Sequence, residues 1–97
     1  MMSGQIAVLV KDTDRQTEAL RVSLGLLPTM QMVSLYFLNR EIDGDADFFI
    51  QGFDHLKEMG GQCYSNHGEN VERFDIEFIT KKEIGRRLKQ ASLVIPV

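Results

Sequence analysis

Apolar runs recur along the chain, separated by stretches that mix apolar and polar positions. Residues 6–10 (IAVLV) and 30–38 (MQMVSLYFL) are almost continuously apolar, which is typical of strands covered on both faces. Shorter runs at residues 62–66, 76–79 and 93–97 are further strand candidates. The pattern therefore predicts five strands.

Three of the segments between these runs place apolar residues at the spacing of a helix. The residues are Leu20, Leu24 and Leu27; Phe49, Phe53 and Leu56; and Ile84, Leu88 and Ala91. Thr13 with Gln16, and Thr80 with Glu83, have the spacing of a capping box, in which two side chains satisfy free backbone N–H groups at a helix start. We expect Pro28 to end the first helix, and a short helix or a loop to join the third and fourth strands.

Strands separated by helical crossovers imply a mainly parallel sheet, because parallel neighbours need a long connection. The predicted fold class is α/β: a three-layer fold with a mainly parallel five-stranded sheet and helices on both faces. The chain has 97 residues, which suits one domain, so we expect a single domain over residues 1–97.

Composition narrows the class of protein. The net charge is −3, and Lys and Arg cluster only at residues 81–89, so nucleic acid is not an expected partner. No apolar stretch approaches the roughly 18 residues that a membrane span needs, and the N-terminal sequence does not resemble a signal peptide. A single cysteine suits a reducing compartment. We expect a soluble, cytoplasmic protein.

Candidate ligand-binding residues follow the predicted strands, because open parallel sheets bind ligands beyond the carboxyl ends of their strands. Asp12 and Asp14 follow the first strand, and Asn66 and His67 follow the third. The two aspartates could stabilise a helix start or form a metal-binding pair of the receiver type, although the further aspartate and lysine of that design are missing. His67 could orient a substrate or donate a proton, or be a plain loop residue.

The residues that a phosphate-binding loop or a zinc site would need are missing from the sequence. KDTDRQTEA follows the first strand, where a glycine-rich phosphate loop would be needed, so a nucleotide- or phosphate-binding module has little support. His55 is expected on the exposed side of its helix, and it does not combine with His67 and Cys63 into a zinc site, which needs three or four convergent ligands. We expect no metal and no cofactor.

The sequence resembles the DsrE/DsrF family, which includes the Tus-type sulfur-relay subunits. The similarity lies in IAVLVKDTDRQTEALRVSLGL followed by MVSLYFLNREID, in GFDHLKEMGGQCYSNHGENVERF, and in FITKKEIGRRLKQASLVIPV. It covers nearly the whole chain. The resemblance implies a small α/β protein that forms homo-oligomers or assembles with DsrE-like partner subunits, and whose active members carry sulfur as a cysteine persulfide.

In the family that this sequence resembles, the cysteine that carries the persulfide lies at the end of the third strand or the start of its loop. The resemblance puts Asn66 at that position of this sequence. Cys63 lies three residues earlier, inside the predicted strand, with Gly61 and Ser65 as its neighbours on one face. A cysteine within a covered strand is usually buried and inert. The favoured interpretation is therefore a binding or structural member without sulfur chemistry, and the alternative is a sulfurtransferase that carries persulfide on Cys63.

Self-association is also suggested by apolar residues that one small sheet would not fully cover. The residues counted in this group are Met30, Met32, Phe48 and Phe49.

Overall fold

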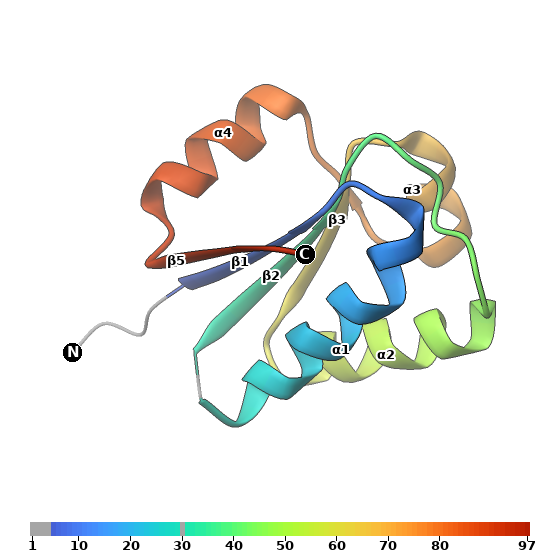
Figure 1. Cartoon of the computed structure of the whole chain (residues 1–97), viewed down its shortest axis with the longest axis horizontal. Coiled ribbons are helices and arrows are strands. Elements are labelled where there is room, and N and C mark those ends of the chain that lie inside the picture. Colours follow the sequence, from blue (N-terminus) through green and yellow to red (C-terminus); the bar gives the residue numbers. More distant parts are fainter. Residues whose placement is uncertain (1–4, 30) are drawn as a thin grey trace.

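Five parallel strands form one sheet in the computed structural model, which describes residues 5–29 and 31–97 (Figure 1). The spatial order is β4-β3-β2-β1-β5. The strands are β1 (Gln5–Val10), β2 (Met32–Phe37), β3 (Gln62–Ser65), β4 (Glu77–Phe78) and β5 (Leu93–Pro96). Every paired neighbour runs parallel, so the sheet is entirely parallel.

Helices cover both faces of the sheet. They are α1 (Gln16–Leu26), α2 (Ala46–Glu58), α3 (Gly68–Phe74) and α4 (Lys81–Gln90), with short 3-10 turns η1 (Thr13–Arg15) and η2 (Leu27–Thr29) flanking α1. The first three crossovers step from β1 towards β4, and the last returns to the far side of β1. Because such crossovers are right-handed, α4 lies alone on the face opposite α1 and α2 (Figure 1). The predicted three-layer α/β fold is confirmed.

The larger core fills the face covered by α1, α2 and α3. Strand alternation turns Ile6, Val8 and Val10 of β1 towards it. A group of phenylalanines forms its centre, with ring centroids 5.6–6.3 Å apart and mostly edge-to-face. This geometry is the preferred one for aromatic pairs. The members of the group are Phe37, Phe49, Phe53 and Phe74.

The smaller core lies beneath α4 and contains a tyrosine pair. Tyr36 of β2 and Tyr64 of β3 stack with ring centroids 5.2 Å apart. Arg87 of α4 donates a 2.7 Å hydrogen bond to the Tyr64 hydroxyl and lies 4.7 Å from the centroid of its ring. Burial raises the pKa of Tyr36, and the hydrogen bond to Tyr64 raises that of Arg87. This contact joins α4 to the two strands with a directional bond.

The structure corrects the predicted start of the first helix. Thr13 begins η1 instead of capping α1, and neither η1 nor α1 has a side-chain cap. The second capping box is half confirmed: the Thr80 hydroxyl accepts from the Glu83 N–H at 3.2 Å, but the Glu83 carboxylate binds arginines of its own helix. The undecided connection between the third and fourth strands is the helix α3.

The prediction that one small sheet would leave several apolar residues uncovered is partly wrong. Phe49 is fully buried in the larger core, and Phe48 is half-buried against it. Met32 is exposed by 44%. Met30, which the sequence pattern placed at the start of the second strand, lies outside the described residues. Among the residues that the structure describes, no helix has the length and apolar character needed to cross a bilayer.

We expect Gly52→Ala to destabilise the protein, because α1 and α2 approach closely at this glycine. A Cβ there would lie 2.5 Å from Cδ2 of Leu20, which is itself fully buried, so the packing of α1 against α2 would have to shift. Overpacking of this kind costs about 1–3 kcal/mol in the free energy of unfolding, measurable by urea denaturation.

Gly25→Ala is the matched control, because a Cβ at this position of α1 meets nothing within 4 Å. The higher helix propensity of alanine is expected to stabilise this variant by up to about 1 kcal/mol. Equal stability of the two variants would contradict the close packing of α1 against α2.

Candidate functional site

A crevice opens at the carboxyl ends of β2 and β3, beside the first turn of α4. Its volume is about 240 Å³, and its lining consists of Leu38, Asn39, Asn66, Lys81 and Ile84. Asn66 follows β3 directly, Asn39 is the second residue after β2, and the lysine and isoleucine come from α4. The site therefore lies where an open parallel sheet is expected to bind ligands.

Two asparagines form the polar side of the crevice. The Asn66 Oδ1 atom accepts a 2.7 Å hydrogen bond from the Asn39 backbone N–H, and Asn66 Nδ2 donates to Asn39 Oδ1 at 3.0 Å. Asn39 has a φ of 69°, a left-handed conformation that asparagine adopts more readily than most residues. The pairing fixes the orientation of both amides, and it uses one of the two acceptor sites on each side-chain oxygen.

The loop after Asn39 is held by the buried amide of Asn70, a residue of α3 that is 1% exposed. Asn70 Oδ1 accepts from the Ile42 N–H at 2.7 Å, while Nδ2 donates to the Arg40 carbonyl at 2.8 Å and to Ser65 Oγ at 3.0 Å. One side chain thus satisfies buried backbone groups of a loop far away in the sequence. Such satisfied buried networks rigidify their surroundings.

Gln16 of α1 holds the same loop from a second direction. Its Nε2 donates to the Glu41 carbonyl and its Oε1 accepts from the Asp43 N–H, both at 2.9 Å. Gln16 is 2% exposed, so these bonds are partly shielded from water. The residue that the sequence suggested as part of a capping box is instead an anchor of the loop beside the crevice.

Ser65, at the end of β3, connects the two strand ends. Its hydroxyl donates to the Phe37 carbonyl at 2.9 Å and accepts from the His67 N–H and from Asn70 Nδ2, both at 3.0 Å. The hydroxyl is fully buried and makes three hydrogen bonds, the number that its one donor and two acceptor sites allow. Asn66, the next residue in the chain, is therefore held at the edge of the crevice.

The structure separates the residues that the sequence grouped as candidates. Asn66 lines the crevice, whereas His67, Asp12 and Asp14 are not among its lining residues. His67 precedes α3, and its Nδ1 atom is buried without a hydrogen-bond partner in the described part of the chain. The two aspartates are exposed before and within η1. Among residues 5–29 and 31–97, no three His, Cys, Asp or Glu side chains gather as metal ligands.

Cys63 faces the larger core, on the opposite side of the sheet from the crevice. It is 2% exposed, and burial raises the pKa of its thiol to about 12, although the positive charge of Lys57 acts in the other direction. The structure thus places the thiol inside the strand and buried, as its position within a strand covered on both faces predicted.

Three residues of the site were not recognised from the sequence. Asn39 had only a positional signal, since it begins the polar loop after the second predicted strand, and Lys81 had none because it looks like an ordinary surface residue. Asn70 did have one: it lies four residues before the buried Phe74, so it is a polar residue on the buried face of a helix.

Comparisons with protein-family models, with curated proteins and with solved structures found no match. The resemblance to the DsrE/DsrF family therefore stays a prediction from the sequence.

We expect Asn70→Ala to loosen the loop at residues 39–43, because it leaves the buried Ile42 N–H and Arg40 carbonyl without partners. An unsatisfied buried group costs about 1–3 kcal/mol in the free energy of unfolding. Faster hydrogen exchange at Ile42 would report the local change. The exposed neighbour Glu69 provides the control, since Glu69→Ala should alter stability by less than about 0.5 kcal/mol.

The buried thiol of Cys63 should make stability fall in alkaline solution. Its pKa rises from 9.0 to about 12 on folding, so above pH 9 the unfolded chain loses a proton that the folded chain retains. From about pH 8 to about pH 10, this group alone should remove about 1.4 kcal/mol from the free energy of unfolding.

The Cys63→Ala variant isolates this effect. Tyr36, whose pKa is also raised by burial, contributes equally to both proteins. The variant should therefore lose less stability over the same pH interval, as measured by urea denaturation. Parallel pH profiles for the two proteins would contradict a buried, protonated thiol.

Proposed function

We propose that this chain is a DsrE-like binding domain without sulfur chemistry of its own, and that its ligand is a small anion held in the crevice beside Asn66. The observation that carries the proposal is that the sheet separates the Cys63 thiol from the Asn66 amide. The thiol of Cys63 lies in the larger core, and the amide of Asn66 lies at the strand ends. The parallel α/β architecture is compatible with the resemblance at the level of fold.

The chemical state of Cys63 argues against a sulfur carrier. A carrier needs a thiolate that a partner's persulfide can reach. Burial raises the pKa of this thiol to about 12, so the thiol stays protonated at neutral pH. The side chain is also covered by the core against which α2 packs. Thiol exchange at Cys63 would require the domain to open.

The free polar groups of the crevice favour an anionic ligand. Each asparagine oxygen already accepts one hydrogen bond and keeps one acceptor site, whereas two side-chain N–H groups of Asn39 and one of Asn66 remain as donors, so donors outnumber acceptors. Lys81 adds a positive charge, and it makes no ion pair in the described part of the chain. A ligand that meets these donors must offer acceptor atoms.

The rest of the crevice limits the size of that ligand. Leu38 and Ile84 provide an apolar wall, and the volume of about 240 Å³ is below the roughly 300–1,000 Å³ of sites for drug-sized molecules. A short carboxylic acid with a small apolar body matches both features. Cytoplasmic location, and assembly with further copies or with DsrE-like partner subunits, stay predictions from the sequence.

Mass spectrometry after incubation with inorganic polysulfide tests the absence of sulfur chemistry. We expect no persulfide adduct on the folded protein, because the thiol is buried and protonated. The same protein in denaturant should gain the mass of one sulfur atom, and the Cys63→Ser variant should not. An adduct on the folded protein that is missing in Cys63→Ser would favour the sulfurtransferase.

Titration with butyrate and its neutral analogue butyramide, followed by NMR, tests the ligand class. Butyrate should shift the amide signals of Asn39 and Asn66, and butyramide should not. Lys81→Ala and Asn66→Asp should each weaken the response, since the first removes a cation and the second adds a repelling carboxylate. Lys89→Ala is the control, because Lys89 is outside the crevice. Equal responses to both compounds would contradict an anion site.

A further inference from the structure

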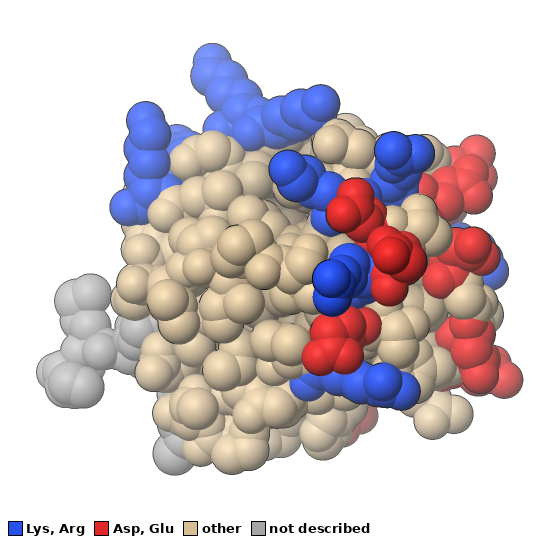
Figure 2. All heavy atoms as spheres, viewed as in Figure 1, with Lys and Arg blue, Asp and Glu red and all other residues tan. Residues whose placement is uncertain are grey.

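The positive charge of the molecule is concentrated on one helix. Of 11 Lys and Arg residues, five lie in the ten residues of α4, whose one carboxylate is Glu83. The helix therefore carries +4, and the six cations and 13 carboxylates elsewhere carry −7, giving the total of −3. Figure 2 shows Lys and Arg side chains projecting at the top of the molecule, where α4 lies in Figure 1, while Asp and Glu gather on the right.

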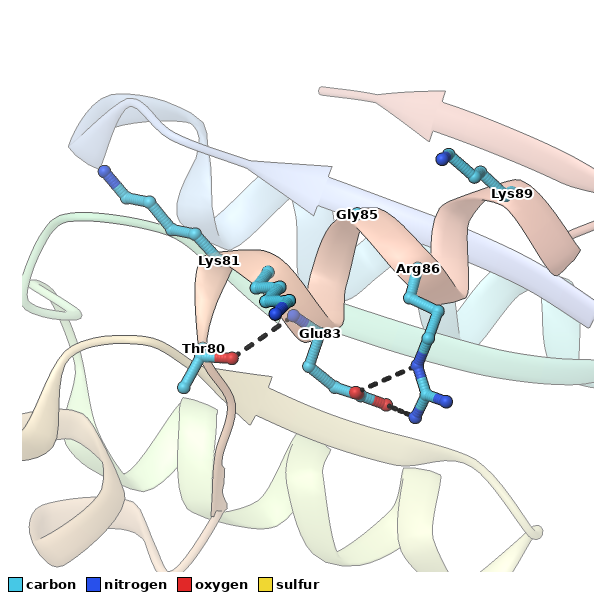
Figure 3. A pocket seen from close by; sticks show the side chains of 7 residues that line it. Thr80, Lys81, Glu83, Gly85, Arg86 and Lys89 are labelled. Atoms are coloured by element: carbon cyan, nitrogen blue, oxygen red, sulfur yellow. Dashed lines mark hydrogen bonds and ion pairs between the residues drawn. The ribbon is translucent and has the colours of Figure 1, made fainter.

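The outer side of α4 is open as well as basic. Lys82, Arg86 and Lys89 follow the i, i+4, i+7 spacing of one helix face. A hollow of about 610 Å³ lies along this side. Gly85 contributes no side chain there, and even a Cβ at this position would meet nothing within 4 Å. Figure 3 shows Lys81, Arg86 and Lys89 extending away from the helix on different sides of Gly85.

This side of α4 already binds one carboxylate. Arg86 holds both oxygens of Glu83, with Nε 3.1 Å from Oε1 and Nη2 2.7 Å from Oε2 (Figure 3). Arg87 adds a 3.1 Å hydrogen bond to Oε2. These bonds, led by that of Arg86, lower the pKa of Glu83. By contrast, in the described part of the chain no carboxylate lies within ion-pair distance of Lys82 or Lys89.

We propose that the outer face of α4 is a docking surface for an acidic segment of a partner protein. Lys82 and Lys89 are seven residues apart, which places them about 10 Å apart along the helix axis. An acidic helix with carboxylates seven residues apart repeats this spacing, so it can meet both lysines at once, while Arg86 between them stays paired with Glu83. Complementary charge of this kind fixes the partner's register and accelerates association.

Two other anionic partners fit the face less well. A helix that lies on a membrane inserts its apolar side, but Ile84 and Leu88 of α4 are packed in the smaller core. Proteins that bind single-stranded nucleic acid stack bases on aromatic side chains, and α4 has none. The net charge of −7 on the remaining residues would also repel a long phosphate backbone.

Binding of poly-L-glutamate at low ionic strength tests the docking surface. The probe should bind the full chain, and added salt should weaken the complex because it screens exposed charges. The double variant Lys82→Gln with Lys89→Gln should lose at least about tenfold in affinity. Neither residue lines the crevice beside Asn66, so butyrate binding should not change and the two proposals are tested separately.

The control variant combines Arg15→Gln with Arg21→Gln. Both arginines are exposed, and they belong to η1 and α1 on the other side of the sheet. This variant has the same net charge as the first, and it should retain affinity within about twofold. Lack of binding to poly-L-glutamate would overturn the proposal, and so would equal losses in the two double variants. Tighter binding to an oligothymidylate or to phosphatidylserine vesicles would overturn the choice of a protein partner.

Discussion

The handedness of the crossovers determines where every functional group of this domain lies. Three connections step across the sheet in one direction, and only the last returns past β1. With right-handed crossovers, three helices share one face and α4 is alone on the other. The crowded face excludes water from its centre, where Cys63 lies. The other face leaves room beside α4 for a crevice, and it exposes the whole outer side of that helix to solvent.

The alternation of side chains along β3 then determines which functional group faces each side of the sheet. Cys63 and Asn66 are separated by an odd number of positions, so their side chains point to opposite sides of the sheet. The chain therefore presents an amide to the crevice and a thiol to the core. A shift of one residue in the register of β3 would exchange the two environments. The pairing of β3 with β2, reinforced by the Ser65 hydroxyl, is what prevents that shift.

The sequence was a good guide where burial alone decides structure. Apolar runs predicted all five strands, and their order along the chain predicted the parallel sheet. The pattern failed where a polar side chain had two possible partners. Gln16 has the spacing of a helix cap, but it bonds to backbone groups about 25 residues further along. Periodicity does not encode such long-range choices, since they depend on which loop the fold brings near.

The burial of individual apolar residues was also hard to predict from the sequence. Phe49 looked surplus to one small sheet, because the sequence does not show how closely α2 and α3 approach. In the structure its ring packs against Phe74, at a centroid distance of 6.1 Å. Asn70 was missed for the converse reason, since a polar residue in a short helix is usually exposed, whereas this one is buried.

The tyrosine stack beneath α4 gives the protein an internal optical probe. The chain has no tryptophan and two tyrosines, and both contribute to the contact with Arg87. The tyrosine bands in the near-ultraviolet absorbance and in the fluorescence of the protein therefore originate from this one junction between helix and sheet. Separation of α4 from the strands would alter these spectra, whereas rearrangements among the phenylalanines on the other face would leave them nearly unchanged.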